Sequence, residues 1–381
     1  MRIMIWSNAP WALTGYGGQV RNLAPRLQEM GHTVAIIANY GLGGSSIEWH
    51  GITVYPMREV GQNADMLGHY AKHFAADVVL GLYDIWALPP DSRKRMGVPW
   101  IAMVPVDGAP VNTRQKERLR TVDYIVAYSR FGQREIEKAG YQTSYVPHAI
   151  DTEIFSPGDK AAAREELGFP QDRYIVSIVA ANKGFPARKA WAPMLLGFKK
   201  FYDEHEEAVL YCHTTKTPYG SAGVGIYFDA LREQAGIPDS AIAFPDQGAL
   251  AIGAPDEQMA DIYRASDVLL LASMGEGFGL PVIEGQACGC PVITQACSAM
   301  TELTCNGIAL EPLQPMWIPQ LGYWWQIPSI ERITNALERI YEGERKDKAG
   351  VKFVRDNYSW PVVWGEYWEP FIEQVVEETL W

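Results

Sequence analysis

The stretch 273-SMGEGFGLPVIEGQACGCPVI-293 places two glutamates, Glu276 and Glu284, on either side of a glycine-rich bend. The apolar run before it, residues 267–272, is typical of a buried strand, and Pro281 favours the first turn of a helix. The backbone N–H groups at a helix start bind phosphate oxygens well, because they lack partners within the helix and lie at the positive end of its dipole. The bend therefore indicates a phosphate-binding turn between a strand and a helix.

The residues within the bend add to this prediction. Gly277 and Gly279 carry no Cβ atom, so the main chain can approach a ligand closely. The two glutamates are expected to avoid a phosphate and to accept hydrogen bonds from the adjacent hydroxyl groups of a diol. A ligand with two diols and a phosphate pair is a nucleotide-sugar. The alternative interpretation is an ordinary helix start, with Glu276 solvated and Glu284 stabilised by the helix dipole.

Outside the bend, short apolar and β-branched runs alternate with longer helical patterns. This alternation is typical of parallel sheets covered by helices, so we expect an α/β fold with two Rossmann-like, doubly wound domains that face a cleft. The expected strands are residues 2–6, 33–38, 77–82, 100–104, 123–128, 144–148, 174–181, 208–213, 267–272 and 291–294. The expected helices are residues 20–30, 189–205, 226–236, 256–266, a short helix from 281, and 359–378.

The length of 381 residues is too great for one ordinary hydrophobic core. Residues 151–172 are rich in proline and glycine and are interpreted as the connection between the two domains. We therefore expect an N-terminal domain of residues 1–155 and a C-terminal domain of residues 156–358. A last helix within residues 359–381 is expected to pack back toward the N-terminal domain.

The net charge of −12 is unevenly distributed along the chain. Residues 1–150 carry 15 Lys and Arg against 12 Asp and Glu, whereas the remainder is strongly acidic. The basic residues between Arg93 and Arg134 are typical of a solvated helix face, but they would also suit an anionic partner such as phospholipid headgroups. The acidic balance argues against extended nucleic-acid binding.

The sequence contains no run that approaches the roughly 20 apolar residues of a membrane span. The apolar run at residues 1–6 is too short for a signal-peptide core, so we expect a cytoplasmic protein, with peripheral contact to an anionic membrane as an open alternative. Four of the five cysteines fall within residues 288–305, but their spacing is uncommon for zinc. No metal site is expected.

The signature S-x-x-E-G-F-G-L-P-V-I-E-G-x-A-C-G-x-P-V-I in residues 273–293 resembles the donor-binding segment of the retaining GT-B glycosyltransferases of family 4, also called glycosyltransferase group 1. The likeness covers most of the chain. It includes the loop 17–19, the domain connection 146–157, the helix and strand 256–273, and Trp360 at the start of the last helix. The resemblance implies that the N-terminal domain lies on the acceptor side and that the C-terminal domain binds the nucleotide-sugar.

The resemblance also implies roles for the residues of the bend. Glu276 would contact hydroxyl groups of the transferred sugar, and Glu284 would bind the ribose diol. The rest of the bend would hold the sugar and diphosphate through its backbone, at Gly277, Phe278, Gly279 and Leu280.

Members of the family bind the diphosphate with an arginine and a lysine, and residues 181–191 occupy the corresponding place. Lys189 matches the family lysine. The arginine role would fall to Lys183 or to Arg188, because the loop is one residue longer than usual.

The remaining implied contacts lie in the N-terminal domain. Gly17 and Gly18 would bring backbone N–H groups to the donor phosphates, or would form a plain helix-entry turn. Residues 104–110 lack the histidine that many members have near the reacting face of the sugar, and Asp107 is the ionisable residue in its place. Asp107 would either contact the donor sugar or acceptor, or cap the turn with Gly108.

The resemblance implies a hexosyltransferase that moves a sugar from a nucleoside diphosphate to an acceptor hydroxyl, with retention of configuration and without a metal ion. The donor would be a UDP- or GDP-sugar, and the acceptor a glycan, a glycolipid or another hydroxyl compound. The catalytic candidates are Glu276, Lys189 and Asp107. Two alternatives stay open: a nucleotide-sugar binding protein without transferase activity, and a sugar-nucleotide epimerase on the same fold.

Overall fold

The computed structural model describes residues 1–57, 64–85, 90–218, 224–345 and 347–380. By its internal contacts the chain divides into two compact units. The N-terminal unit comprises Met1–Ala149, Pro319–Tyr323 and Trp360–Trp381, and the C-terminal unit comprises Ile150–Ile318 and Trp324–Ser359.

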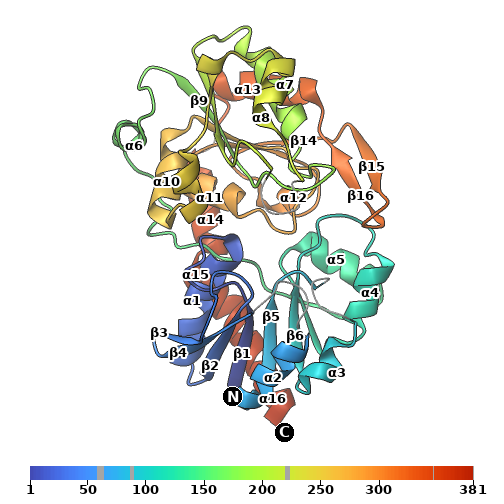
Figure 1. Ribbon diagram of the computed structural model, residues 1–381. Coiled ribbons are helices and arrows are strands. Elements are labelled where there is room, and N and C mark those ends of the chain that lie inside the picture. Colours follow the sequence, from blue (N-terminus) through green and yellow to red (C-terminus); the bar gives the residue numbers. More distant parts are fainter. Residues whose placement is uncertain (58–63, 86–89, 219–223, 346, 381) are drawn as a thin grey trace. The chain divides into compact units, whose positions relative to one another are not determined.

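The N-terminal unit is built on an eight-stranded sheet in the order β3-β4-β2-β1-β5-β6-β7-β8 (Figure 1). The pairs from β4 to β8 are parallel, and β3 runs antiparallel to β4. Central strands such as β5 are buried along their whole length, as expected where helices cover both faces of a parallel sheet. The strands are β1 (Arg2–Ser7), β2 (Thr33–Ala38), β3 (Ile47–Trp49), β4 (Ile52–Pro56), β5 (Val78–Leu82), β6 (Trp100–Val104), β7 (Tyr124–Ala127) and β8 (Ser144–Tyr145).

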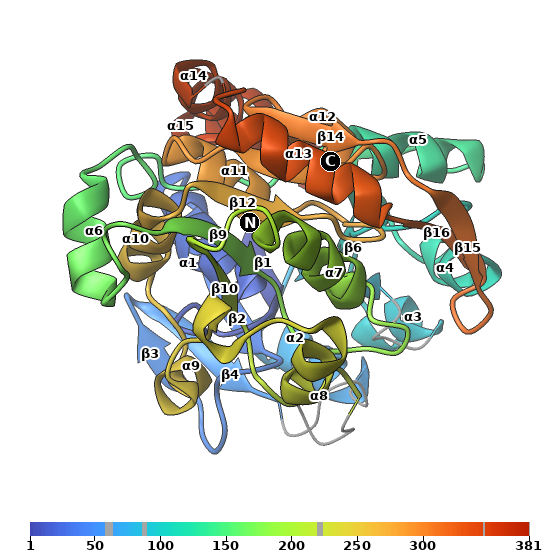
Figure 2. The same ribbon diagram turned by 90° about the horizontal axis from the view of Figure 1, so that it is seen from above.

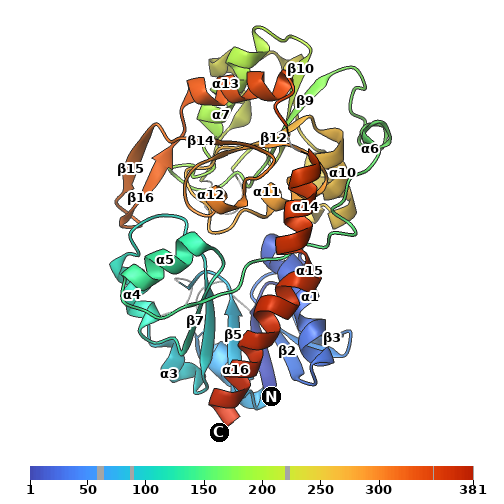
Figure 3. The same cartoon turned by 180° about the vertical axis from the view of Figure 1, so that it is seen from behind.

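Helices from both ends of the chain cover this sheet. α16 runs along one of its faces (Figure 3), where Phe371 packs edge-on against Tyr124 of β7 with ring centroids 6.5 Å apart. The helices are α1 (Gly15–Glu29), α2 (Ala64–Phe74), α3 (Ser92–Met96), α4 (Thr113–Leu119), α5 (Arg130–Lys138), α15 (Trp360–Val363), a π-helical turn (Trp364–Trp368) and α16 (Glu369–Leu380). The last helix, expected to be continuous over residues 359–378, is therefore interrupted by the π-helical turn.

α1 begins five residues earlier than the sequence suggests, and the glycines of the expected loop form its first turn. Thr14 caps the helix, since its side chain accepts a hydrogen bond from the N–H group of Gly17. A Cβ atom on Gly17 would lie 2.0 Å from the carbonyl oxygen of Ala12, whereas a Cβ atom on Gly18 would meet nothing closer than 3.8 Å. The close approach to Ala12 explains why a glycine stands at position 17 in spite of its low helix propensity.

Gly17→Ala is expected to lower the free energy of unfolding by about 3 kcal/mol, because the added methyl group overlaps backbone that cannot move away easily. The matched variant, Gly18→Ala, should be neutral or stabilising by up to about 1 kcal/mol. Urea unfolding followed by circular dichroism measures both. Equal stabilities for the two variants would contradict this packing of α1.

The C-terminal unit contains a six-stranded parallel sheet in the order β11-β10-β9-β12-β13-β14. A separate two-stranded sheet, β15-β16, follows β14 in the chain. The strands are β9 (Tyr174–Val179), β10 (Ala208–His213), β11 (Ile242–Ala243), β12 (Val268–Leu271), β13 (Val292–Gln295), β14 (Gly307–Leu310), β15 (Gln314–Ile318) and β16 (Tyr323–Ile327).

Helices pack closely on this sheet and on one another. α7 and α13 lie side by side (Figure 2), and a Cβ atom on Gly197 of α7 would come within 2.5 Å of the Ile333 side chain of α13. The helices are α6 (Lys160–Leu167), α7 (Trp191–Tyr202), α8 (Phe228–Ala235), the 3-10 turn Asp239–Ala241, α9 (Gln247–Ile252), α10 (Asp256–Ala265), α11 (Leu280–Ala287), α12 (Met300–Leu303), α13 (Ile330–Tyr341) and α14 (Asp347–Tyr358). Within the described residues, no helix has both the length and the apolar character that a membrane crossing requires.

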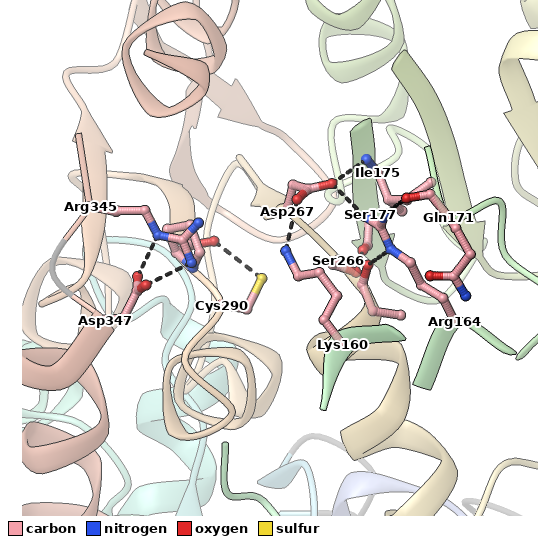
Figure 4. Close-up of polar contacts among 12 residues, drawn as sticks. Lys160, Arg164, Gln171, Ile175, Ser177, Ser266, Asp267, Cys290, Arg345 and Asp347 are labelled. Carbon is pink, nitrogen blue, oxygen red and sulfur yellow. Dashed lines mark hydrogen bonds and ion pairs between the residues drawn. The ribbon is translucent and has the colours of Figure 1, made fainter. Parts of the chain in front are cut away.

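Asp267, at the amino end of β12, binds side chains of α6 in the segment 151–172 that connects the two units, and so attaches this segment to the sheet (Figure 4). Its carboxylate accepts hydrogen bonds from Lys160 Nζ at 2.8 Å and from Arg164 Nη2 at 2.7 Å, both in α6. It also accepts one from the N–H group of Ile175 in β9 at 2.7 Å. The network holds the amino ends of β9 and β12 together. The loops that carry the sequence candidates leave the carboxyl ends of the same two strands.

Candidate functional site

The strand order of the C-terminal sheet reverses between β9 and β12, because β10 follows β9 on one side and β12 lies on the other. Open parallel sheets bind ligands beyond the carboxyl ends of their strands at such a reversal. The loops that leave the two strands are residues 180–190 and 272–279. They carry Lys183, Arg188, Lys189 and the glycine-rich bend, so the fold itself brings these sequence candidates to one edge of the sheet.

The carboxylate of Glu276 lies between two cations of the facing loop. Arg188 Nη1 donates a hydrogen bond to Glu276 Oε2 at 2.8 Å, and Lys189 Nζ donates one to Oε1 at 2.5 Å. Arg188 also donates to the carbonyl oxygen of Gly275, and its own carbonyl accepts from the N–H group of Met274 at 2.8 Å. The loops after β9 and β12 are thus joined by charge-assisted hydrogen bonds.

These three charged side chains are largely removed from solvent, with 7% of Glu276, 15% of Lys189 and 24% of Arg188 exposed. Burial alone would raise the pKa of Glu276, but the adjacent Arg188 and Lys189 lower it to about 2. Burial lowers the pKa of Lys189, and the charge of Glu276 opposes that change. Glu276 is therefore ionised at neutral pH and lies between two side chains that can also bind a further anion.

The bend leads directly into α11. Gly279 is the N-cap with φ of +115°, a conformation that favours glycine, and it offers no side-chain oxygen to the first N–H groups of the helix. Pro281 lies in the first turn, as its fixed φ favours. The ring of Phe278 is buried and packs against Tyr358, with centroids 5.9 Å apart, so Phe278 can meet a ligand through its backbone.

Glu284 lies within α11 and accepts a hydrogen bond at Oε2 from the hydroxyl of Tyr263, 2.6 Å away. Burial, assisted by the charge of Asp256, raises the pKa of Glu284 to about 7 against the opposing effect of the Tyr263 hydrogen bond. The two glutamates of the bend therefore differ: Glu276 is ionised at neutral pH, whereas the pKa of Glu284 lies near neutrality. Hydroxyl donors from a bound diol would favour the ionised form of Glu284.

Of the two candidates for the arginine role, Arg188 joins the cluster and Lys183 is an exposed residue of the same loop. The neighbouring Asn182 is buried and anchors the start of this loop. Its Nδ2 donates to the carbonyl oxygen of Ile226 at 2.7 Å, and its Oδ1 accepts from the N–H group of Ile226 at 2.7 Å. The structure thus brings Arg188, Lys189 and Glu276 together.

Gly17, Gly18 and Asp107 belong to the N-terminal unit. The N–H group of Gly17 donates to Thr14 Oγ1 at 3.1 Å, and that of Gly18 donates to the carbonyl oxygen of Thr14 at 2.9 Å. Asp107 Oδ1 accepts a hydrogen bond at 2.9 Å from the hydroxyl of Tyr323, the first residue of β16, which belongs to the N-terminal unit with the rest of Pro319–Tyr323. Each of the three therefore has a partner within its own unit, and roles for them toward a donor stay predictions.

Two residues of the cluster were not anticipated from the sequence. Ser298 Oγ accepts a hydrogen bond from the N–H group of Glu276 at 2.8 Å, and Tyr263 orients Glu284. They lie 22 and 21 positions from their partners, so no local sequence signal could have identified them. Across the residues that the structure describes, no group of three or more His, Cys, Asp and Glu side chains is arranged to hold a metal ion.

A separate cavity of about 450 Å³ opens near the amino ends of β12 and β13, where Cys290 is among its lining residues. Its cations include Lys160, which is paired with Asp267, and Arg345, which is paired with Asp347 (Figure 4). Because it lies toward the strand ends opposite the bend, this cavity is not part of the candidate site.

Known structures share this fold over nearly their whole length. Sucrose-phosphate synthase from Thermosynechococcus elongatus superposes with a TM-score of 0.76 at 17% identity, covering 99% of this chain and all of that one. Alr3699/HepE of Anabaena, solved in complex with UDP-glucose, gives a TM-score of 0.71 at 13% identity over 100% of this chain and 99% of its own. These likenesses confirm the expected α/β class: two Rossmann-like domains of the GT-B type.

The sequence comparison finds a family likeness in the C-terminal unit. Residues 247–355 match the family described as "Glycosyl transferases group 1". D-inositol 3-phosphate glycosyltransferase of Segniliparus rotundus is 29% identical over 233 residues, which cover 58% of this chain and 47% of that protein. The enzyme of the same name from Mycolicibacterium smegmatis is 29% identical over 164 residues, covering 42% of this chain and 33% of the relative. Residues 247–355 are thus similar to the group 1 glycosyltransferases, and the chain spans less than half the length of these curated relatives.

Proposed function

We propose that this protein transfers a hexose from a nucleoside-diphosphate sugar to an acceptor hydroxyl, with retention of configuration and without a metal ion. The observation that carries the proposal is the contact of Glu276 with Arg188 and Lys189 beside the start of α11. The arrangement offers a carboxylate to sugar hydroxyls, and next to it cations and backbone N–H groups to a diphosphate. The bend between Glu276 and Glu284 also lies within the segment that matches the family.

The ion pairs of Glu276 with Arg188 and Lys189 indicate how the donor would bind. In the structure Glu276 is the anion that neutralises Arg188 and Lys189 in part. A diphosphate carries more negative charge and would compete for both cations, while Glu276 turns to hydroxyl groups of the sugar. The buried charges are then paired before and after binding, so the cations are held in place for the reaction.

In the proposed reaction the bond between the anomeric carbon and the leaving phosphate oxygen breaks, and a bond to the acceptor oxygen forms on the same face. The acceptor proton passes to the leaving phosphate, so no enzyme nucleophile is required. Positive charge develops on the sugar and negative charge on the leaving diphosphate. Arg188, Lys189 and the N–H groups at the start of α11 would stabilise the negative charge.

The donor is proposed to be a UDP- or GDP-sugar whose ribose diol binds Glu284. The pKa of about 7 makes this contact sensitive to pH. A diol donates stronger, charge-assisted hydrogen bonds to the carboxylate than to the protonated acid, so donor binding lowers the pKa of Glu284. Donor affinity should therefore increase as pH rises through 7, with release of a proton on binding.

Between pH 5.5 and pH 8 the donor dissociation constant is expected to fall by about tenfold or more, since one pKa unit corresponds to a factor of ten. Isothermal titration calorimetry in buffers of different ionisation enthalpy measures both the constant and the released proton. Glu284→Gln should bind more weakly and show no such pH dependence, whereas Glu257→Gln, an exposed carboxylate in α10, should retain it. A wild-type constant that does not change with pH would contradict the role of Glu284.

The function itself is tested in two stages. A thermal-shift screen with UDP, GDP, ADP and their common sugars identifies the donor, and labelled donor is then incubated with candidate acceptor glycans and glycolipids. Labelled sugar on an acceptor, with the anomeric configuration of the donor, is the expected result. Conversion of the donor to an epimer would indicate the epimerase, and donor binding without transfer or hydrolysis would indicate a binding protein.

A further inference from the structure

We propose that Trp317 and Trp324, on the outer face of the β15–β16 sheet, bind a sugar ring of a carbohydrate acceptor. This inference rests on the proposed function, because it specifies the acceptor class of the same reaction. We call the two side chains the tryptophan pair. No part of the signature that resembles the family includes them.

The tryptophan pair is unusually exposed for residues of its size. Trp317 and Trp324 are 44% and 43% exposed, and their rings meet at an angle of 60° with centroids 5.2 Å apart. Leu313 and Leu321, in the same short segment, are also exposed. Single exposed apolar residues are common, but a gathering of this kind marks a binding surface.

The strand geometry fixes which way the tryptophan pair faces. Successive side chains of a strand point to opposite faces, and the neighbours Ile318, Tyr323 and Trp325 are buried. The sheet is therefore anchored by one face and presents the tryptophans on the other. A flat, fixed aromatic surface suits the apolar C–H face of a pyranose ring, whose hydroxyl groups stay at its edge and remain available to water or to polar side chains.

Hydrogen bonds connect the base of this sheet to the candidate donor site. The N–H group of Gln326 in β16 donates to the carbonyl oxygen of Met274 at 2.9 Å, two residues before Glu276. Gln295 Nε2 donates to the carbonyl oxygens of Gln326 at 2.9 Å and of Ser273 at 2.8 Å. The sheet that carries the tryptophan pair is thus attached to the loop that carries Glu276, which places a sugar-binding surface on the same framework as the proposed sugar-transfer site.

The charge pattern favours a carbohydrate over a membrane surface. Residues 312–330 contain no Asp, Glu, Lys or Arg, and their polar residues include Gln314, Gln320 and Gln326. A surface segment that binds anionic lipid normally supplies Lys or Arg beside its aromatic residues. By strand alternation Gln326 shares a face of β16 with Trp324, and a neutral amide next to an exposed indole ring suits the hydroxyl groups and apolar face of a neutral sugar.

The experiment measures binding of defined oligosaccharides to the full chain. Maltotriose, cellotriose, chitotriose and mannotriose are each tested by saturation-transfer NMR and by titration of tryptophan fluorescence. We expect at least one to bind the wild type, and Trp324→Leu and Trp317→Leu to weaken that binding by about tenfold each. Trp324→Phe should retain more affinity than Trp324→Leu, because phenylalanine keeps a ring face and leucine keeps only apolar volume.

Controls separate this inference from the proposed function. Leu313→Ala removes an exposed apolar residue of the same segment without an aromatic ring and should bind like the wild type. The affinity for a UDP- or GDP-sugar should be unchanged in all of these variants. If the wild type binds no UDP- or GDP-sugar, that result contradicts the proposed function and not the role of the tryptophan pair. The inference is overturned if none of the four sugars binds the wild type, or if the leucine variants bind as well as it does. It is also overturned if the tryptophan pair is needed for sedimentation with phosphatidylcholine–phosphatidylglycerol vesicles or for self-association, and not for sugar binding.

Discussion

Lys189→Ala is expected to lower kcat for sugar transfer by about 10²- to 10³-fold, the usual cost of removing one group that stabilises charge in a transition state. Lys189 is the more deeply buried of the two cations on Glu276, and it contacts Oε1 at 2.5 Å. Without Lys189, the leaving diphosphate loses a positive charge that the loop after β9 holds in place. Steady-state kinetics with the donor found by the thermal-shift screen measure the change.

Lys199→Ala provides a matched control for this variant. Lys199 lies in α7, ten residues after Lys189 in the chain, and pairs with Asp203 one helical turn away. Its removal should leave kcat within about twofold of the wild type, because surface pairs of this kind contribute little. If Lys189→Ala and Lys199→Ala had equal kcat for sugar transfer, the proposed role of Lys189 in stabilising the leaving diphosphate would be contradicted.

Glu276→Gln is expected to separate donor binding from transfer. The neutral amide no longer competes with a diphosphate for Arg188 and Lys189, so free UDP or GDP should bind about tenfold more tightly than to the wild type. Transfer should nevertheless fall by about 10²-fold or more, because the carboxylate that orients the sugar is lost. Calorimetry with the nucleoside diphosphate and kinetics with the sugar donor give the two quantities.

The opposite directions of these two effects make the prediction specific. A variant that had only lost its fold would bind the nucleotide more weakly and also transfer more slowly. Glu257→Gln removes an exposed carboxylate of α10 and should change neither quantity. If Glu276→Gln binds the nucleotide more weakly than the wild type, Glu276 does not act as the competing anion.

Most of the parallel strands were predictable because burial on both faces requires continuous apolar runs. β2, β6 and β10 lie at the expected residues, and β1, β5 and β12 differ by at most one residue at each end. The start of α1 was missed because helix propensity disfavours glycine and does not report the close packing of Gly17 on the chain just before it, at Ala12. The β15–β16 sheet was also missed, since Pro315, Pro319 and Gly322 resemble a loop in the sequence.

For the candidate site, the sequence identified the loops but not the contacts between them. Glu276, Glu284 and Lys189 were chosen from local patterns and a family resemblance. The loop geometry was needed to bring Arg188, and not Lys183, to Glu276. The sequence also did not predict the charge states of the two glutamates. The pKa of Glu276 is about 2, because its carboxylate contacts Arg188 and Lys189. The pKa of Glu284 is about 7, because its carboxyl group is buried beside Tyr263.

A crystal structure of the protein with the nucleotide-sugar chosen by the screen tests the central claim most directly. We expect the diphosphate to accept hydrogen bonds from Arg188, Lys189 and the first N–H groups of α11, with Glu276 on the sugar hydroxyls and Glu284 on the ribose diol. The claim would be contradicted if Glu276 still bound both cations, Glu284 contacted only Tyr263, and the ligand lay elsewhere on the protein.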